Sequence, residues 1–155
     1  MERIYYQGTP AQCERAFKEL CAQNPKAGFI PRTGGLIPEL PMLDQIIYPG
    51  LIAGWKRQEL MDRLQAISPV PVHRLHDLPG RSNDRVRAWA ALLRVLLQGP
   101  ELILANGFFE EQEPQLLAQF LSLLPQDTGL VCLGTQAPQT EVLRCERLID
   151  TRRIP

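Results

Sequence analysis

Three short apolar runs typical of buried strands in this 155-residue sequence are each followed by residues at which chemistry could be placed. Arg32 follows residues 27–31, Asn106 and Gly107 follow residues 102–105, and Gln136 lies shortly after residues 130–133. Arginine is an obligate cation, and neither glycine nor a side-chain amide supplies a general base or a carboxylate for a metal ion. These positions therefore indicate no acid–base chemistry of their own. A general base would have to come from another position, and Glu110 and Glu111, shortly after Gly107, are the candidates for such a displaced base.

Residues 78–109 form the framework around one of these positions. Ser82 or Asn83 can cap an amphipathic helix, and Gly99 with Pro100 stops it before the apolar run at 102–105. A turn, a helix, a second turn and a buried strand make a unit that is common in parallel α/β sheets. The sequence therefore predicts an α/β fold in which helices flank a mainly parallel sheet.

Caps and apolar spacing predict the remaining elements. Thr9, Pro10 and Gln12 have the pattern of a capping box at a helix start. The other expected helices include Arg57–Ile67, one beginning at Glu113 and Pro114, and a short one over 141–144; the other expected strands are Arg3–Gln7, 27–31, 130–133 and 147–150. We expect one domain, residues 1–155, with a small helical subdomain at about 36–77.

Charge and composition exclude several functions. The 17 basic and 17 acidic side chains balance, so no electrostatic attraction to nucleic acid is expected. No apolar run approaches the roughly 20 residues that span a bilayer, and the start of the sequence lacks a signal-peptide pattern. We therefore expect a cytoplasmic protein without direct membrane insertion. The four cysteines have no metal-type spacing, and His73 and His76 have no third ligand nearby, so neither a metal nor a cofactor is expected.

The segment 78–109 resembles the part of ABC-transporter ATPase domains that runs from the signature motif to the Walker B strand. The positions in register are Leu78, Gly80, Arg85, Val86, Leu92, Leu93, Pro100, Glu101 and the apolar run that follows. Gly28, Phe29 and Pro31 resemble the family's strand before its magnesium-contacting glutamine, and Cys145 with Arg147 resembles its last strand. The resemblance implies a P-loop-NTPase-like (RecA-like) fold.

The sequence departs from the family at the residues that perform its chemistry. Asn106 stands at the magnesium-directing aspartate, Gly107 at the catalytic glutamate, Arg32 at the glutamine and Gln136 at the γ-phosphate histidine. The signature reads Leu78, Pro79, Gly80, Arg81, Ser82, with proline in place of the family's serine and arginine in place of its second glycine. A fragment of a working ATPase would retain these groups, so four losses in one direction favour a pseudo-ATPase.

The family's phosphate loop, Gly-x-x-x-x-Gly-Lys-Ser/Thr, does not occur in these residues. The resemblance implies that its N-terminal phosphate-loop part is absent and that its strand would lie between strands 130–133 and 147–150. Three alternatives fill that place: residues 148–150 shift inward, residues 3–6 enter the sheet, or a partner supplies a strand.

Residues 28–55 resemble the region that grips a coupling helix of the transporter's membrane subunit. The candidate partner-binding residues are Leu36, Ile37, Leu40, Leu43, Ile46 and Tyr48. We expect a regulatory or scaffolding protein that binds a transporter's membrane subunit or a full ATPase subunit, is held at the inner membrane through that transporter, and is compatible with a dimer. The alternatives are a subunit that lends a modified signature, through Arg81, to ATP hydrolysis by a partner, and a cytoplasmic remnant with no transporter link.

Overall fold

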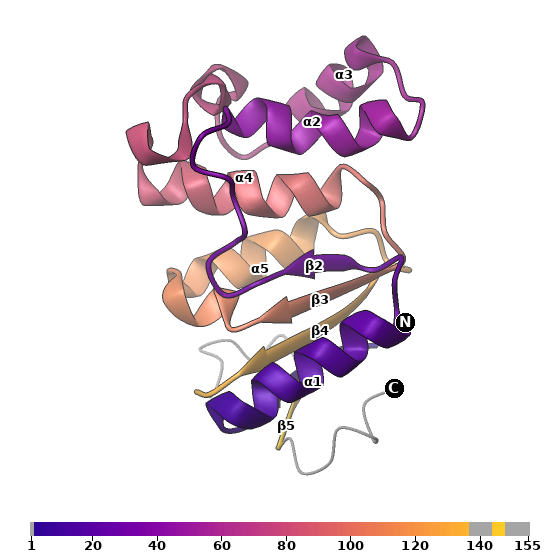
Figure 1. The fold of residues 1–155 in the computed structure, drawn as a ribbon, viewed down its shortest axis with the longest axis vertical. Helices are drawn as coiled ribbons and strands as arrows, with labels where there is room; N and C mark the ends of the chain where they lie inside the picture. The colour runs from indigo at the N-terminus through magenta and orange to yellow at the C-terminus, as the bar shows by residue number, and fades with distance from the viewer. Residues whose placement is uncertain (1, 137–143, 148–155) are drawn as a thin grey trace. The chain divides into compact units, whose positions relative to one another are not determined.

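The computed structural model describes residues 2–136 and 144–147. The chain divides into two compact units, a sheet unit (Met1–Arg32 with Pro100–Pro155) and a helical unit (Thr33–Gly99). Figure 1 shows the elements of both units. The helical unit is larger than the predicted insertion at 36–77, because the helix after Asn83 packs against the first helix of this unit.

The sheet unit is built on five parallel strands in the order β2-β3-β4-β1-β5. The strands are β1 (Arg3–Gln7), β2 (Gly28–Ile30), β3 (Leu102–Asn106), β4 (Gly129–Gly134) and β5 (Arg144–Arg147). This is the predicted α/β class, with a parallel P-loop-NTPase-like sheet and flanking helices.

Strand β1 lies between β4 and β5 and pairs with both. It therefore occupies the place that the resemblance gives to the phosphate-loop strand, which confirms the second of the three alternatives. Only Gly8 and Thr9 separate β1 from helix α1 (Pro10–Gln23).

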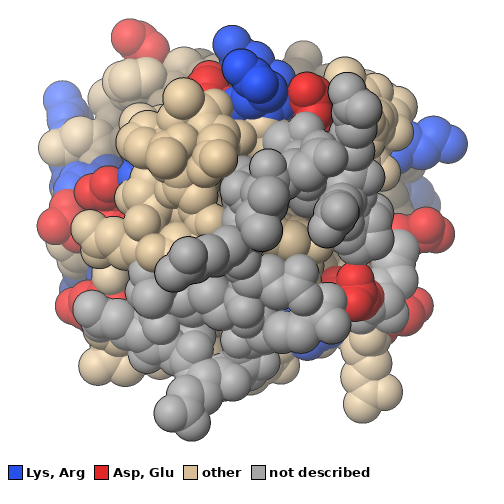
Figure 2. Space-filling view, turned by 90° about the horizontal axis from the view of Figure 1, so that it is seen from below, with Lys and Arg blue, Asp and Glu red and all other residues tan. Residues whose placement is uncertain are grey.

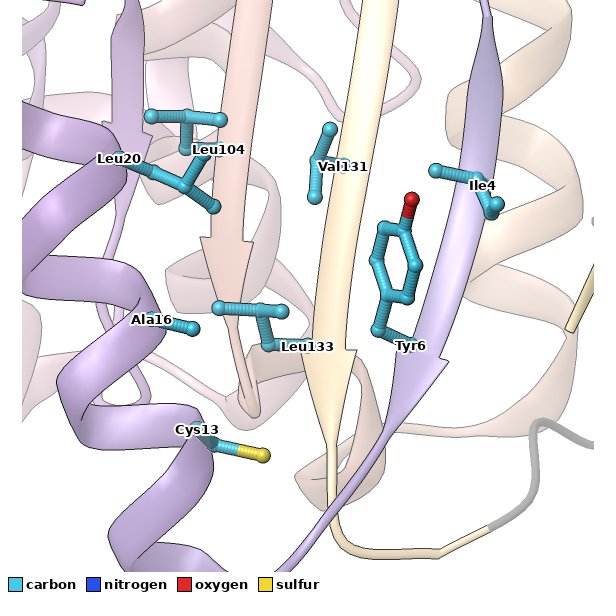
Figure 3. Close-up of a cluster of buried hydrophobic side chains, with 8 residues drawn as sticks. All are labelled: Ile4, Tyr6, Cys13, Ala16, Leu20, Leu104, Val131 and Leu133. Carbon is cyan, nitrogen blue, oxygen red and sulfur yellow. The ribbon is translucent and has the colours of Figure 1, made fainter. Parts of the chain in front are cut away.

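Helix α1 begins where its capping residues predict. The Thr9 hydroxyl accepts a hydrogen bond from the Gln12 N–H at 3.2 Å, and the Gln12 side chain accepts one from the Thr9 N–H at 2.8 Å. Its buried side packs on one face of the sheet, as Figure 3 shows for Cys13, Ala16 and Leu20 beside strand residues. The strand side of this cluster consists of Ile4, Tyr6, Leu104, Val131 and Leu133. Burying these side chains holds α1 on the sheet.

Helix α5 (Pro114–Leu123) lies on the opposite side of the sheet from α1 in Figure 1. It follows a short 3-10 helix, η3 (Phe108–Glu111), whose N-cap is Gly107. The Phe109 ring lies 5.3 Å from that of Phe108 and 5.5 Å from that of Phe120 on α5, centroid to centroid. These aromatic contacts fix η3 at the end of β3.

The helical unit contains α2 (Met42–Ile52), α3 (Arg57–Ile67), α4 (Asp84–Leu96) and two 3-10 helices, η1 (Val72–His76) and η2 (Pro79–Arg81). The Asn83 side chain caps α4 by accepting from the Val86 N–H at 2.9 Å. Helix α2 packs against α3, α4 and η1, and its buried side includes Leu43 and Ile46. The predicted bounds Arg57–Ile67 are those of α3.

The structure differs from two predicted elements near the C-terminus, a short helix and the last strand. The short helix expected over 141–144 does not include Arg144, which begins β5. The strand expected at 147–150 is β5 at Arg144–Arg147, because its backbone pairs in parallel with β1 from Ile4 to Gln7. Residues 137–143 and 148–150 lie outside the described residues.

Candidate functional site

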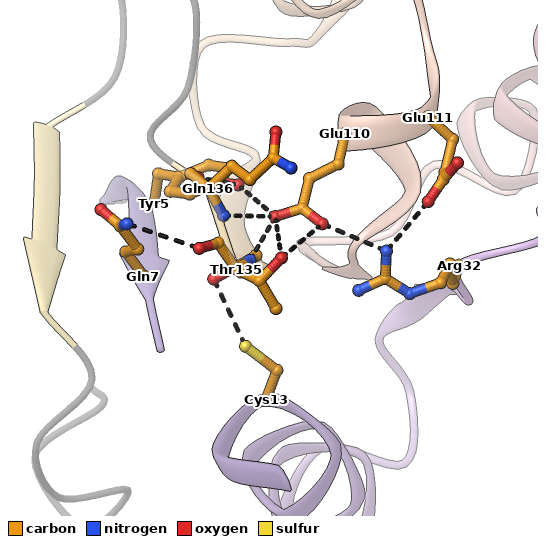
Figure 4. A network of polar contacts seen from close by, with 9 residues as sticks. Tyr5, Gln7, Cys13, Arg32, Glu110, Glu111, Thr135 and Gln136 are labelled. Atoms are coloured by element: carbon orange, nitrogen blue, oxygen red, sulfur yellow. Dashed lines mark hydrogen bonds and ion pairs between the residues drawn. The ribbon is translucent and has the colours of Figure 1, made fainter. Parts of the chain in front are cut away.

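A polar cluster forms in the sheet unit where β2, β3 and β4 end. We call it the edge cluster and define it by Tyr5, Arg32, Glu110, Thr135 and Gln136. Figure 4 shows side-chain groups of Tyr5, Arg32 and Thr135 and the backbone N–H of Gln136 converging on the carboxylate of Glu110. Arg32 comes just after β2, Glu110 from η3, and Thr135 with Gln136 from the end of β4. In parallel sheets this edge is where ligands are usually held.

Glu110 accepts hydrogen bonds from most of the cluster. Its Oε1 atom accepts from the Gln136 N–H at 2.8 Å and from the Thr135 N–H. The Thr135 hydroxyl lies 3.2 Å from both carboxylate oxygens. The Tyr5 hydroxyl lies 3.3 Å from Oε1 and 2.8 Å from the Gln136 carbonyl oxygen, so its single proton serves either acceptor. The side chain of Glu110 is 8% exposed.

Arg32 closes the cluster with an ion pair. Its Nη1 lies 3.1 Å from Glu110 Oε2 and 3.1 Å from Glu111 Oε1. Glu111 is 59% exposed, so its share of the interaction is screened by solvent. Arg32 therefore binds mainly the buried carboxylate of Glu110.

The pKa values in the edge cluster follow from these contacts. Burial raises the pKa of the Glu110 carboxyl, but the hydrogen bonds from Gln136, Arg32 and Thr135 outweigh burial and place it below its ordinary value. The hydrogen bond with Glu110 raises the pKa of Arg32. Burial, followed by the negative charge of Glu110, raises the pKa of the Tyr5 hydroxyl well above its usual value. Glu110 is therefore a charged carboxylate at neutral pH, and Tyr5 is neutral.

Gly107 is required by the position of Arg32. Gly107 has a φ of +71°, a conformation that glycine adopts more readily than other residues. A Cβ atom at this position would overlap the guanidinium of Arg32. The position that resembles the catalytic glutamate of ABC ATPases therefore has no room for a side chain while Arg32 stays in place.

Gly134 also stands where a side chain would collide with its neighbours. A Cβ atom there would overlap the Tyr5 hydroxyl and come within 2.5 Å of Glu110 Oε1. The Gly134 carbonyl accepts from the Gly8 N–H at 2.9 Å and from the Cys13 thiol at 3.4 Å. The end of β4 is thus held by β1 and α1, independently of Glu110.

Asn106 and Gln136 contribute differently from what their positions predict. Asn106 is buried, 7% exposed, and its Oδ1 atom has no hydrogen-bond partner among the described residues. Gln136 is exposed, and it supplies the cluster with its backbone N–H. The sequence pointed to Arg32, Gly107 and Gln136, which the structure brings together, but it gave Glu110 only the role of a displaced base.

The predicted signature residues lie in the helical unit at η2 and its end. Pro79 is buried, whereas Gly80 and Arg81 are exposed. Arg87 on α4 donates to the Pro79 carbonyl at 3.1 Å and to the Ser82 carbonyl. These bonds fix the turn while leaving Gly80 and Arg81 open to solvent.

The helical unit also carries a groove with a volume of about 620 Å³. Its lining is mainly apolar and combines residues before and along α2 with two arginines: Ile37, Leu40, Asp44, Gln45, Ile47, Tyr48, Pro49, Leu51, Arg57 and Arg94. Three of the predicted partner-binding residues, Ile37, Leu40 and Tyr48, line it and are 49%, 43% and 62% exposed.

The other predicted partner-binding residues do not line the groove. Leu43 and Ile46 are 2% and 1% exposed, so the prediction that they contact a partner directly is wrong. They lie on the side of α2 that packs into the helical unit, whereas Tyr48 lies on the exposed side. Leu36 is half-buried.

The side chains of Gln45 and Arg94 shape the groove through hydrogen bonds to the backbone before α2. Gln45, which is 7% exposed, donates to the carbonyls of Ile37 and Leu40 and accepts from the Ile37 N–H at 2.7 Å. Arg94 donates to the carbonyls of Gly34 and Gly35 at 2.7 and 2.8 Å. Burial lowers the pKa of Arg94. Residues 34–40 are therefore held in one conformation, which keeps the apolar side chains of Ile37 and Leu40 at the surface.

Among the described residues, no group of three or more His, Cys, Asp or Glu side chains has the arrangement of a metal site. Within the same residues, no helix is both long and apolar enough to cross a bilayer. On the face drawn in Figure 2, the described acidic and basic side chains are interspersed around the rim.

The parallel strand order and the flanking helices are those of the P-loop-NTPase-like class. Solved structures support this class: an ATP-binding subunit of an ABC transporter matches with a TM-score of 0.68 at 15% identity, over 86% of this chain and 68% of that one. A dimeric bacterial ABC transporter cassette matches with a TM-score of 0.67 at 14% identity, over 87% of this chain and 75% of that one. The fold is therefore that of an ABC ATPase.

The sequence itself is similar to ATP-binding proteins of ABC transporters. The Fe(3+) ions import ATP-binding protein FbpC 2 of Pectobacterium atrosepticum is 29% identical over 110 residues, 68% of this chain and 30% of that protein. The lipoprotein-releasing system ATP-binding protein LolD of Syntrophus aciditrophicus is 24% identical over 84% of this chain and 60% of that protein, and LolD of Shewanella frigidimarina is 31% identical over 54% and 36%. The chain thus spans about a third to three fifths of these relatives. No protein-family model matches it.

Proposed function

We propose that this chain is a catalytically inactive ABC-ATPase-like protein that regulates or scaffolds an ABC transporter by binding its membrane subunit or an ATPase subunit. The observation that carries the proposal is the groove in the helical unit. It lies where the resemblance places the surface that grips a coupling helix, and Ile37, Leu40 and Tyr48 expose apolar surface in it. Exposed apolar side chains around a groove fit the apolar face of a partner helix.

The edge cluster supports the inactive half of the proposal. Phosphoryl transfer relies on positioned charges, a metal ion and an oriented nucleophile. The position of the catalytic glutamate is Gly107, beneath the Arg32 guanidinium, and the position of the magnesium-directing aspartate is Asn106. Magnesium binds carboxylate oxygens, and the carboxylate of the cluster, Glu110, already binds Arg32. The donor set therefore does not fit a magnesium ion.

The relatives suggest the setting in which such a protein works. FbpC 2 and LolD are ATP-binding proteins of an import and a release system, and the solved cassette is a dimer. By analogy, this chain works at the cytoplasmic side of the inner membrane, bound to a transporter, and a dimer with itself or with a full ATPase subunit is compatible with its fold.

Affinity purification from the native host tests the proposal. The tagged chain should capture a transporter membrane or ATPase subunit, identified by mass spectrometry. Ile37→Asp with Tyr48→Asp should abolish this capture, because both changes place charge in the groove. Arg15→Asp, on an exposed site of α1, is the control and should capture the same subunit. Equal capture by the groove variant, or no transporter subunit at all, would contradict the proposal.

The exposed turn at η2 favours a second candidate function. Gly80 and Arg81 are exposed, and arginine suits phosphate binding. In this alternative the chain lends its modified signature to ATP bound by a partner. Arg81→Ala should then lower the partner's ATP turnover, whereas unchanged turnover leaves the scaffolding role alone.

A further inference from the structure

The donors of the edge cluster converge on one carboxylate although they come from separate parts of the sheet unit. Two consecutive backbone N–H groups, of Thr135 and Gln136, donate to Glu110 Oε1, and the Thr135 hydroxyl lies within 3.2 Å of both oxygens. Arg32 adds a guanidinium 3.1 Å from Oε2. Successive amides, a hydroxyl and an arginine are the donor set with which proteins bind phosphate and related anions.

The backbone donors of Thr135 and Gln136 are positioned by contacts that do not involve Glu110. The end of β4 is bound by Gly8 and Cys13 through the Gly134 carbonyl. Gln7 donates to the Thr135 carbonyl at 3.4 Å. The two N–H groups are therefore preorganised by β1, α1 and β4. Arg32 follows β2, and the carboxylate comes from η3, a four-residue helix anchored elsewhere through Phe109 and Phe120.

Two glycines keep additional side chains out of the edge cluster. Both glycines that border it, Gly107 and Gly134, lack a side chain where a Cβ would overlap Arg32, Tyr5 or Glu110. The carboxylate lies beside Gly134, and only 8% of the Glu110 side chain is exposed.

We propose that the edge cluster is an oxyanion-binding site whose resident occupant is the carboxylate of Glu110. The ligand class is a tetrahedral oxyanion such as inorganic phosphate, which binds when that carboxylate is removed. The inference goes beyond the proposed function, because it concerns the chain alone and requires no partner.

Glu110 belongs to the same chain as its donors, and this attachment favours it over a free anion. A group attached to the same chain acts at an effective concentration of millimolar or more, so a free anion at similar concentration competes poorly. Removing the carboxylate leaves the Thr135 and Gln136 N–H groups without their acceptor and leaves Arg32 with only the exposed carboxylate of Glu111, which is a costly state that a bound anion relieves. The carboxylate of Glu110 thus occupies the donors that a free anion would need.

Titration of purified variants with inorganic phosphate tests this proposal. Wild type, Glu110→Ala and Glu111→Ala are titrated by calorimetry up to 10 mM phosphate, with chloride at equal ionic strength as the reference. Glu111→Ala is the matched control, since it removes the same charge from Arg32 but leaves the buried carboxylate in place. Glu110→Ala should bind phosphate at least tenfold more tightly than wild type and the control. Adding Arg32→Ala to Glu110→Ala should abolish the gain.

Equal phosphate binding by Glu110→Ala and wild type would overturn the proposal. So would an equal gain in Glu111→Ala, which would assign the effect to net charge. If Glu110→Ala is unfolded in chloride, circular dichroism follows its folding as phosphate is added. Recovery of native signal at phosphate concentrations that do not change the thermal midpoint of Glu111→Ala supports the site, and no recovery overturns it. Turnover of ATP by wild type would refute the proposed function and leave this result unaffected.

Discussion

The edge cluster and the groove differ in which side chains they leave available for binding. In the edge cluster, polar groups satisfy one another, and a buried carboxylate occupies the donors that a ligand would need. In the groove, apolar side chains remain open to solvent, and Gln45 and Arg94 hold the backbone that displays them. A site for chemistry keeps reactive groups available, whereas a site for contact keeps apolar surface available. The contrast favours a protein that acts by binding.

Removing the buried carboxylate should lower stability strongly. Glu110→Ala leaves the Thr135 and Gln136 amides without their acceptor and Arg32 with only the exposed Glu111, so we expect the free energy of unfolding in chloride buffer to fall by about 3 kcal/mol. Urea denaturation measures it. Glu111→Ala should cost under about 1 kcal/mol, because that carboxylate is exposed. Similar losses of unfolding free energy in the two variants would contradict the distinction between the buried carboxylate of Glu110 and the exposed carboxylate of Glu111.

The buried and exposed members of the predicted partner-binding set should also separate. Leu43→Ala creates a cavity in the helical unit and should cost about 2–4 kcal/mol of unfolding free energy. Tyr48→Ala, at a site that is 62% exposed, should cost under about 0.5 kcal/mol. Chemical denaturation of both variants checks this. A large cost at Tyr48 would mean that the groove wall is part of the core.

Gly107 and Arg32 should be coupled. Gly107→Ala adds a Cβ that displaces the Arg32 guanidinium and imposes a positive φ on alanine, so we expect a loss of about 2 kcal/mol. In an Arg32→Ala background the overlap is gone, and the same change should cost only about 1 kcal/mol. A double-mutant cycle measures the difference. Additive costs would show that Arg32 does not occupy the space above Gly107.

The contribution of Glu110 should depend on pH in a defined direction. Its folded-state pKa lies below the ordinary carboxyl value, so its stabilisation is present above about pH 4.3 and is lost as pH falls through the folded-state pKa. The difference in unfolding free energy between wild type and Glu110→Gln should therefore be largest at neutral pH and shrink in acid. Denaturation curves from pH 7 to pH 3 follow it, and a constant difference would contradict the lowered pKa.

Local sequence signals predicted the elements well where the chain carries its own caps. Thr9 caps the helix that it was expected to cap, Asn83 is the one of the two candidates, Ser82 and Asn83, that caps α4, and α3 has its predicted bounds. The place of β1 in the sheet remained open among three alternatives, because strand order depends on pairing between distant segments.

The role of Glu110 could not be predicted for a related reason. It depends on η3, which aromatic contacts with α5 hold at the end of β3, and on amides that β4 supplies from 25 residues away. The partner-binding residues were the apolar side chains of a region selected by resemblance, and neither criterion separates Leu43 and Ile46, on the buried side of α2, from Tyr48 on the exposed side.

The most direct test of the central claim is titration of the purified chain with Mg-ATP, followed by calorimetry and by release of inorganic phosphate. Because Gly107 has no room for a side chain and Arg32 binds the carboxylate of Glu110, we predict no heat of binding and no phosphate release at millimolar nucleotide. Saturable ATP binding, or phosphate released by the wild-type chain alone, would contradict the account.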